Sequence, residues 1–339
     1  SNNLYTTFSS LGGRQKKFSY YAYYNYKKGD GFRDNSEFKS NNFYIHLGYE
    51  VNRRTKITGE ISYLNYLAQQ AGGLSDKMFL NSPLQSNRSR NWFGLDWFLF
   101  NLKLKHKFST TSNLSINFFG LDAERNSIGF RSNRVDQVDP FTERDLIKGE
   151  FNNHGVEVKF LNNYSFFNLR NVFVIGGKYY RSKSTSKQGP GSSLDDADFE
   201  FYLDKFPNYT NQSDYMYPNK NIALFGENII YITDKISLTP GLRYENILTR
   251  SDGSFKQINL DAAGNVIYNN TTYEKQNSRR SFFLFGLGLS YKPSKDIEWY
   301  SNVSQNYRSV TFADISIINP SYAINPNISD EKGITVDLG

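Results

Sequence analysis

The chain has 339 residues, of which 38% are apolar and 17% aromatic, with 25 tyrosines, 28 phenylalanines and no cysteine. It has no run of about 18 apolar residues, which excludes a membrane-spanning helix but not spanning strands, since these need only about 10 alternating residues. The net charge of +7 comes from scattered basic residues without a clustered patch, so no nucleic-acid partner is expected.

Alternation of apolar and polar residues, which is the signature of β-strands, recurs along the whole sequence. Residues 41–51, for example, place Phe43, Ile45 and Leu47 on one face and His46 on the other. We predict about 13 strands, over residues 1–10, 16–27, 41–51, 55–67, 91–108, 113–125, 150–162, 169–182, 220–232, 236–250, 279–292, 296–307 and 333–339.

The connections between these strands alternate strictly between short and long. Outer-membrane barrels have this asymmetry, because their periplasmic turns are short and their extracellular loops long, whereas long structureless loops are uncommon in compact soluble domains. The pattern therefore predicts an all-β fold, a large antiparallel transmembrane β-barrel. The short joins are 11–15, 52–54, 109–112, 163–168, 233–235 and 293–295, and the long ones are 28–40, 68–90, 126–149, 183–220, 251–278 and 308–332.

The order of short and long connections also predicts how much of the barrel is present. If a barrel begins and ends on the periplasmic side, the first and last predicted strands are both even-numbered, so the chain covers about 13–14 strands. Barrels with more than about 18 strands form the plugged-transporter class, and a 22-strand barrel would have about eight further strands. We expect residues 1–339 to be one partial barrel domain, without the plug or the closing strands. The absence of a signal peptide at Ser1 also indicates a fragment.

Several segments resemble TonB-dependent outer-membrane receptors. They are 17–33, then 66–74 followed by 88–93, and the pair 223–228 and 238–245. In the last of these, Pro240 and Gly241 predict a bulge or bend near the periplasmic rim. The segment 306–315, followed by 325–327 and 330–333, is similar to the late-barrel signature of the same receptors. The combination most resembles ferric-citrate receptors of the Bacteroidetes type.

This resemblance implies TonB-dependent active import of a ferric chelate, most simply ferric citrate, across the bacterial outer membrane. It also implies partners: the TonB complex, reached through an N-terminal part outside this sequence, and the surrounding outer-membrane lipid and lipopolysaccharide. Another ligand (a siderophore, a cobalamin or an oligosaccharide) remains open, as does a passive porin. The resemblance implies no enzyme activity and no cofactor.

An anionic chelate calls for arginine, whose guanidinium pairs with carboxylates through two parallel hydrogen bonds. Arginines in long connections at the outer rim are therefore the candidates, with neighbouring glutamines as hydrogen-bond donors. The alternative is that these arginines pair with loop acids such as Asp136 and Asp139, or with lipopolysaccharide phosphates. The predicted ligand-binding residues are Arg88, Arg90, Arg131, Arg134, Gln69 and Gln70.

Catalytic and metal chemistry have little support in the sequence. The three histidines, His46, His106 and His154, lie on separate predicted strands with no nucleophile motif beside them. The acidic stretch 195–198 offers carboxylates that could bind calcium, but no second ligand set follows at a fixed spacing, so a solvated loop is the better interpretation. We predict no catalytic residue and no metal site.

Overall fold

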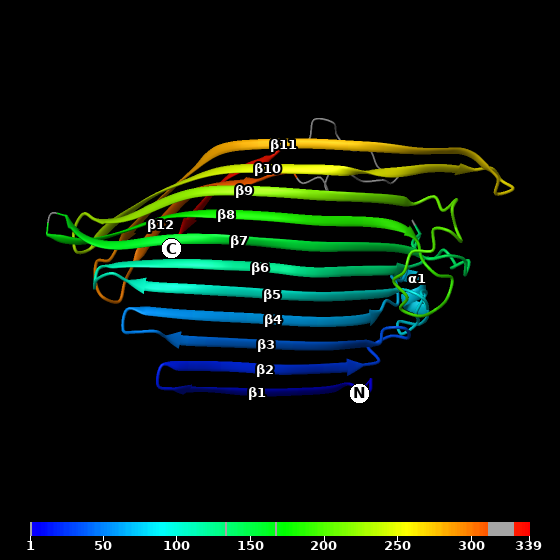
Figure 1. Cartoon of the computed structure of the whole chain (residues 1–339), viewed down its shortest axis with the longest axis horizontal. Helices are drawn as coiled ribbons and strands as arrows, with labels where there is room; N and C mark the ends of the chain where they lie inside the picture. The colour runs from blue at the N-terminus through cyan, green and yellow to red at the C-terminus, as the bar shows by residue number, and fades with distance from the viewer. Residues whose placement is uncertain (1, 133, 167, 311–328) are drawn as a thin grey trace.

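In the computed structural model, which describes residues 2–132, 134–166, 168–310 and 329–339, the chain forms one antiparallel sheet. Its 13 strands follow chain order, each pairing with its sequence neighbours (Figure 1), so the predicted all-β fold and strand number are confirmed. The elements are β1 (Tyr5–Gln15), β2 (Phe18–Gly29), β3 (Phe38–Glu50), β4 (Thr55–Gln69), α1 (Asp76–Asn81), β5 (Trp92–Lys107), β6 (Ser112–Gly129), β7 (Asp145–Phe166), β8 (Leu169–Pro190), β9 (Gln212–Tyr231), β10 (Ile236–Leu260), β11 (Val266–Tyr291), β12 (Trp299–Arg308) and β13 (Glu331–Leu338).

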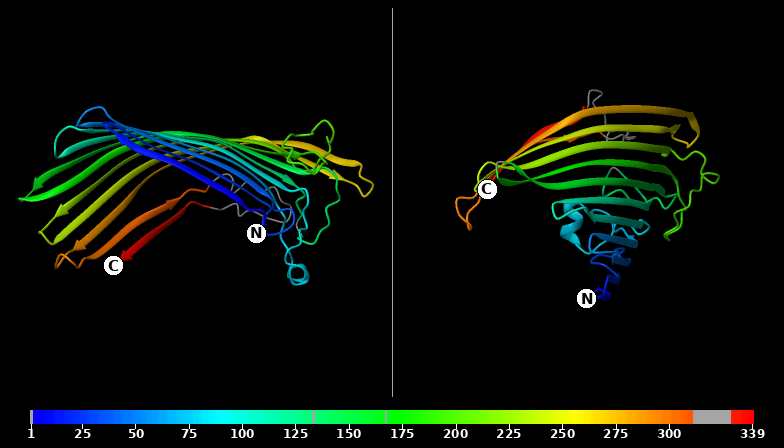
Figure 2. Two further views of the ribbon diagram at one scale, coloured as in Figure 1. Left: turned by 90° about the horizontal axis from the view of Figure 1, so that it is seen from below. Right: turned by 60° about the vertical axis from the view of Figure 1, so that its left-hand side comes forward.

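The sheet curves into an open arch (Figure 2). Among the described residues, β1 and β13 are its two edges and do not pair with each other. Helix α1 lies in a connection beside the sheet. Its N-terminus is capped by Ser75, whose hydroxyl accepts a hydrogen bond from the Met78 amide. No helix in the described part of the chain is long and apolar enough to cross a membrane.

The two faces of the sheet differ in chemistry, because side chains alternate along each strand and directly paired residues share a face. One face, here the outer face, carries exposed apolar side chains such as Phe98, Leu224 and Phe285. The other, the interior face, carries polar and charged groups, among them His46 and Glu60, whose side chains lie 3.0 Å apart. A wet interior and an apolar exterior are what a membrane barrel requires.

The two ends of the sheet also differ. At one end, the turn end, strands are joined by the short connections 16–17, 51–54, 108–111, 167–168, 232–235 and 292–298; the other end, the loop end, carries the remaining connections. The first strand continues to Gln15 and turns at Lys16, which has a positive φ of 53°, so the predicted short join at 11–15 was wrong. The late-barrel segment 311–328 lies outside the described residues.

The long connection predicted over 251–278 was wrong, because this segment forms a projecting β-hairpin. Strands β10 and β11 pair residue by residue from Ile236–Tyr291 out to Asn259–Tyr268, leaving only 261–265 as the turn. At this tip Asp261 accepts hydrogen bonds from the Ala263 and Asn265 amides, and Gly264 adopts a φ of +85°. Short and long connections therefore alternate less strictly than the sequence predicts.

Candidate functional site

The connections 70–91, 130–144 and 191–211 pack together at the loop end and are joined by buried arginines. Arg90 is 1% exposed, and its guanidinium donates hydrogen bonds to both carboxylate oxygens of Asp139, at 2.6 and 3.0 Å. It also donates to the Thr142 and Ser193 carbonyls. All three connections thus meet at one guanidinium, and charge-assisted bidentate pairing of this kind is strong.

Arg144 is the second such residue, and nothing in its local sequence predicted it. Its guanidinium is fully buried and donates to the carbonyls of Arg90, Ser192 and Asp196 and to the Ser192 hydroxyl, at 2.6–3.0 Å. Burial lowers the pKa of the Arg144 guanidinium, and the nearby charge of Arg90 lowers it further. Backbone carbonyls satisfy its donors, so the residue serves to hold loops together.

Arg88 is also buried, with its guanidinium 4.9 Å from the Phe130 ring. It donates to the Ser132 hydroxyl at 2.8 Å and to the Gln137 carbonyl at 3.1 Å. Together, Arg88, Arg90 and Arg144 define what we call the arginine-linked loop cluster. Pairing with protein groups accounts for the donors of Arg88 and Arg90, so their contact with a ligand stays a prediction.

The carboxyl of Asp139 shows the electrostatics of this cluster. Burial alone would raise its pKa, but hydrogen bonds from Arg90 and the Phe141 amide, with the charge of Arg90, hold the pKa below its usual 3.8. The acid is therefore ionised at neutral pH. Its ion pair with Arg90 contributes stability that is complete above the usual pKa and lost as the pH falls through the lower folded-state value.

A groove of about 480 Å³ opens beside the cluster, along the loop ends of β5–β7. Strand register places Phe93, Arg125 and Ile147 on the interior face here. Two of the predicted residues, Gln70 and Arg131, line the groove, whereas the other four do not. The lining residues that matter for its chemistry are Gln70, Asn91, Phe93, Arg125, Arg131 and Ile147.

Asn91 determines where the chain leaves β6 and so where Arg131 lies. The side-chain oxygen of Asn91 accepts a hydrogen bond from the Phe130 amide at 2.8 Å, and its side-chain nitrogen donates one to the Phe130 carbonyl at 3.2 Å. A Cβ atom on Gly129 would lie 2.2 Å from the Asn91 side chain, so only glycine leaves room for this contact. The next residue, Arg131, is thereby held at the mouth of the groove.

Arg131 is half exposed and is oriented from one side by protein groups. Its Nε lies 3.3 Å from the buried carboxylate of Asp145, and its Nη2 donates to the Ser127 hydroxyl at 3.0 Å. Asp145 in turn accepts hydrogen bonds from Gln188 and from the Tyr209 hydroxyl at 2.8 Å. Burial, and then the charge of Asp145, raises the pKa of the Tyr209 phenol, so Tyr209 stays a donor. The Nη1 atom of Arg131 has no partner among the described residues and remains available to an anion.

Arg125 is the functional candidate that our sequence reasoning missed. It is exposed on the interior face, 5.6 Å from the Phe151 ring, and it has no acidic partner among the described residues. The signal was present, because counting by twos along β6 from Asn117 puts Arg125 on the polar face. The groove therefore presents two guanidinium groups. That of Arg131 is anchored by Asp145 and Ser127, and that of Arg125 has no acidic partner in the described part of the chain.

The remaining predicted residues lie outside the groove. Gln69 is on the outer face and donates to the Ser89 carbonyl at 2.5 Å, while Arg134 pairs at 2.9 Å with Asp136 in an exposed ion pair. In the acidic stretch, the carboxylates of Asp195 and Asp196 lie within 4 Å of Arg90 and Arg144. Across the described residues, no group of three or more histidines and acids is placed to hold a metal ion.

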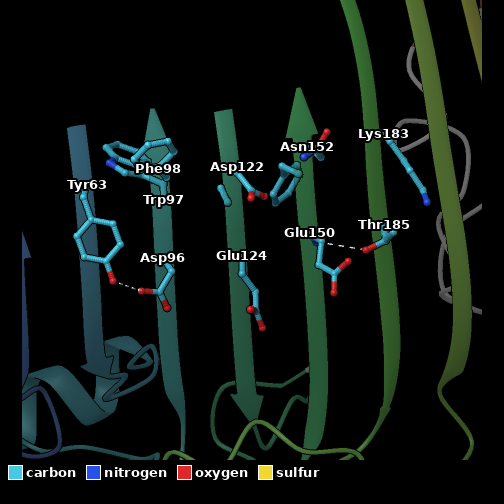
Figure 3. Close-up of a pocket in the computed structure, with 12 residues that line it drawn as sticks. Tyr63, Asp96, Trp97, Phe98, Asp122, Glu124, Glu150, Asn152, Lys183 and Thr185 are labelled. Atoms are coloured by element: carbon cyan, nitrogen blue, oxygen red, sulfur yellow. Dashed lines mark hydrogen bonds between the residues drawn. The ribbon is translucent and has the colours of Figure 1, made fainter. Parts of the chain in front are cut away.

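A second hollow, of about 540 Å³, lies near the loop end of β4–β8 (Figure 3). Asp96, Asp122, Glu124 and Glu150, which share the outer face, dominate it. Part of this charge is met locally, since Tyr63 donates to Asp96 and the Lys148 ammonium lies 3.5 Å from Glu124. An acidic surface of this kind does not suit an anionic chelate, so the interior groove is the candidate ligand site.

The comparisons with known proteins agree with this geometry. The family model described as TonB dependent receptor-like, beta-barrel matches residues 1–339. The chain belongs to this family. A search of the curated proteins finds no match. As a TonB-dependent receptor barrel, the chain is a protein of the bacterial outer membrane, with its loop end extracellular and its turn end periplasmic.

Solved receptor structures share the fold at low sequence identity. The ferric citrate transporter FecA, in its unliganded form, is 15% identical with a TM-score of 0.74, covering 98% of this chain and 45% of its own. The ferric yersiniabactin uptake receptor FyuA from Yersinia pestis is 12% identical with a TM-score of 0.74, covering 100% and 50%. The siderophore receptor PiuA from Acinetobacter baumannii is 12% identical with a TM-score of 0.70, covering 99% and 52%. The TonB-dependent receptor chain described here spans about half the length of these proteins.

Proposed function

We propose that this chain forms part of the wall of a TonB-dependent receptor that imports an anionic iron chelate, with ferric citrate as the leading candidate. The observation that carries the proposal is the convergence of Arg125 and Arg131 on one interior groove at the extracellular end. Carboxylates of a chelate would pair with these guanidinium groups, and Gln70 would donate a further hydrogen bond. The barrel supplies a binding wall and no covalent chemistry.

The other parts of the mechanism belong to the proposal as well. A plug inside the barrel would gate the lumen, and the TonB complex would transmit the energy that opens it. The hydrogen bonds of Arg90 and Arg144 between the connections support such a role, because a site whose loops are already linked binds without first having to order them. The FecA and FyuA likenesses support an iron chelate of some kind and leave its identity to experiment.

Binding of radiolabelled iron citrate to the full receptor in detergent tests the proposal. A charge-assisted hydrogen bond contributes about 1.5–3 kcal/mol, so Arg125→Gln is expected to weaken binding about 10- to 100-fold. The matched control is Arg134→Gln, which removes an exposed arginine that is already paired with Asp136 outside the groove. Saturable binding that survives Arg125→Gln unchanged would remove this groove from the mechanism.

Competition separates the chelates. Excess unlabelled iron citrate should displace the label, whereas a hydroxamate or catecholate siderophore, a cobalamin or an oligosaccharide should not. Absence of saturable binding by iron citrate, together with binding of one of these competitors, would reassign the ligand and leave the barrel and groove in place.

A further inference from the structure

The projecting β10–β11 hairpin leaves one of its two edges open. Its tip extends past the ends of the other strands (Figure 1). Strand β9 covers the edge of β10 as far as Lys256, whereas β12 pairs with β11 only as far as Gly286. Among the described residues, the edge of β11 over 267–281 therefore has no strand beside it. Because β12 is already the neighbour of β11, closing the barrel would not cover this edge.

Alternate residues of an antiparallel strand direct their backbone groups to opposite edges, and two contacts show which residues of β11 face the open side. The Lys292 amide donates to the Lys235 carbonyl, so even-numbered residues face β10. The Phe285 amide donates to the side chain of Gln305 on β12, so odd-numbered residues face the other way. The pairing with β10 continues without a register shift as far as Asn259–Tyr268. Over 267–281, the odd-numbered residues thus present N–H and C=O groups that no described strand meets.

The sequence of this edge favours pairing with another strand. Residues 266–273, Val-Ile-Tyr-Asn-Asn-Thr-Thr-Tyr, include no charged residue, glycine or proline, and most are β-branched or aromatic. The side chains of Ile267 and Tyr273 are 66% and 82% exposed. Exposed edges of natural sheets are usually protected by charges or prolines, and this stretch has neither. An edge of this kind can accept an extended segment as an additional strand.

We propose that the open edge of β11 binds an extended segment of another protein at the cell surface, which adds to the hairpin as an antiparallel strand. Antiparallel pairing is more stable per residue than parallel pairing. The hairpins of two receptor copies in one membrane point the same way and could pair only in parallel, so a second copy is not the occupant. Strand β11 runs from the tip towards the membrane, so the bound segment runs away from it. This inference is independent of which chelate is imported.

The side chains along the edge specify what the segment carries. Arg279 is exposed near the membrane and has no acidic partner in the part of the chain that the structure describes. Lys275, the next cation along the same side, is paired with Asp252 at 3.3 Å. An acid near the N-terminal end of the segment would therefore lie beside Arg279. Towards the tip, Tyr273 and Ile267 favour aromatic or β-branched neighbours on the added strand.

The test measures binding of a fluorescent peptide to the full receptor in a non-ionic detergent. The probe alternates valine and threonine and carries two glutamates at its N-terminal end. Thr271→Pro removes one N–H from the open edge and leaves the bonds to β10, so it should weaken binding about tenfold, equivalent to about 1.4 kcal/mol of backbone hydrogen bonding. Ala262→Pro is the matched control, because it places proline in the tip turn, where the Gly264 amide bonds the Asp261 carbonyl. Heat modifiability on a gel verifies that each variant is folded.

Hydrogen exchange and a reversed peptide complete the test. The Thr271 amide should exchange faster than the Asn270 amide in the receptor alone and become protected when the peptide binds. The same peptide with its glutamates at the C-terminal end should bind more weakly, because they would lie far from Arg279.

Several outcomes would overturn the proposal. These are no binding of the peptide to the wild type, equal binding to Thr271→Pro and Ala262→Pro, or tighter binding of the reversed peptide. Slow exchange of the Thr271 amide in the receptor alone would show that the edge is already paired within the chain. Self-association of the receptor that Thr271→Pro abolishes would make a second copy the occupant, which also contradicts the proposal.

Discussion

Two regions at the extracellular end achieve order by opposite means. Over β4–β8, three long connections are held by buried guanidinium groups, with Arg90 alone contacting Asp139, Thr142 and Ser193. At β10–β11 the chain also projects, but there it is held by a backbone ladder that runs residue by residue out to Asn259–Tyr268. The first region depends on a few side chains. The second depends on many equivalent hydrogen bonds, so single substitutions should affect the two regions very differently.

The same contrast exists within the arginines of the rim. Arg90 and Arg144 have their donors occupied by protein carbonyls and carboxylates, whereas Arg125 presents an exposed guanidinium to the interior groove. All three residues are arginines near the rim of the barrel. What distinguishes Arg90 and Arg144, which support the loops, from Arg125, which is proposed to bind the ligand, is their burial and their hydrogen-bond partners. The four predictions that follow address the loop cluster and the hairpin, in order of expected effect.

The largest effect is expected from Arg90→Leu. Removing one partner of a buried ion pair leaves the other charge uncompensated and costs about 3–5 kcal/mol, so the free energy of local opening of the loop cluster should fall by about that amount. Hydrogen exchange at the Asn87 and Gly191 amides, whose acceptors are the Ala71 and Arg144 carbonyls, measures it. Arg134→Leu, which breaks an exposed pair, should leave both amides unchanged. Similar exchange in the two variants would mean that Arg90 does not support the cluster.

A smaller effect in the same region is expected from Gly72→Ala. Gly72 has a φ of +76°, and a Cβ atom there would lie 2.2 Å from Asn87 and 2.6 Å from Arg88. Strain of this kind costs about 1–3 kcal/mol, which should appear as faster exchange of the Asn87 amide. The adjacent Gly73→Ala is the control, because its nearest neighbour is Val135 at 3.7 Å. An equal response to both substitutions would contradict the crowding argument.

Acidification should weaken the cluster without any substitution. The folded-state pKa of Asp139 is below the usual 3.8, so the Arg90–Asp139 contribution should persist as the pH falls to that value and disappear only at lower pH. A protonated carboxyl still accepts one hydrogen bond, so the effect should be smaller than that of Arg90→Leu. Protease protection of residues 130–144, measured with an acid-active protease, reports it. The variant Asp139→Asn should lose the dependence, and a transition well above 3.8 would assign it to another group.

The sequence predicted the membrane-spanning part of each strand because lipid on one side and water on the other impose alternation. Beyond the membrane both faces of a strand meet water and the constraint disappears. This is why Ser251, Asp252 and Gly253 read as a loop although they continue β10. The interior position of Arg125 follows from alternation. Alternation does not predict the partners of Arg90. Asp139 and Ser193 lie 49 and 103 residues away from it in the chain, and the packing of the connections brings them together.

The smallest effect is expected at the hairpin tip, with Gly264→Ala. Gly264 has a φ of +85° but no atom near a Cβ position, so the substitution costs only left-handed backbone strain of about 1 kcal/mol. Exchange of the Asn265 amide, which donates to Asp261, should accelerate by a few fold. Gly264→Asn should have less effect, since asparagine tolerates this conformation. Exchange of the Asn87 amide in the loop cluster should stay the same, because the backbone ladder of β10–β11 should confine the strain to the hairpin tip. A response there would show that the two regions are coupled, and the hairpin would then be part of the loop cluster's support.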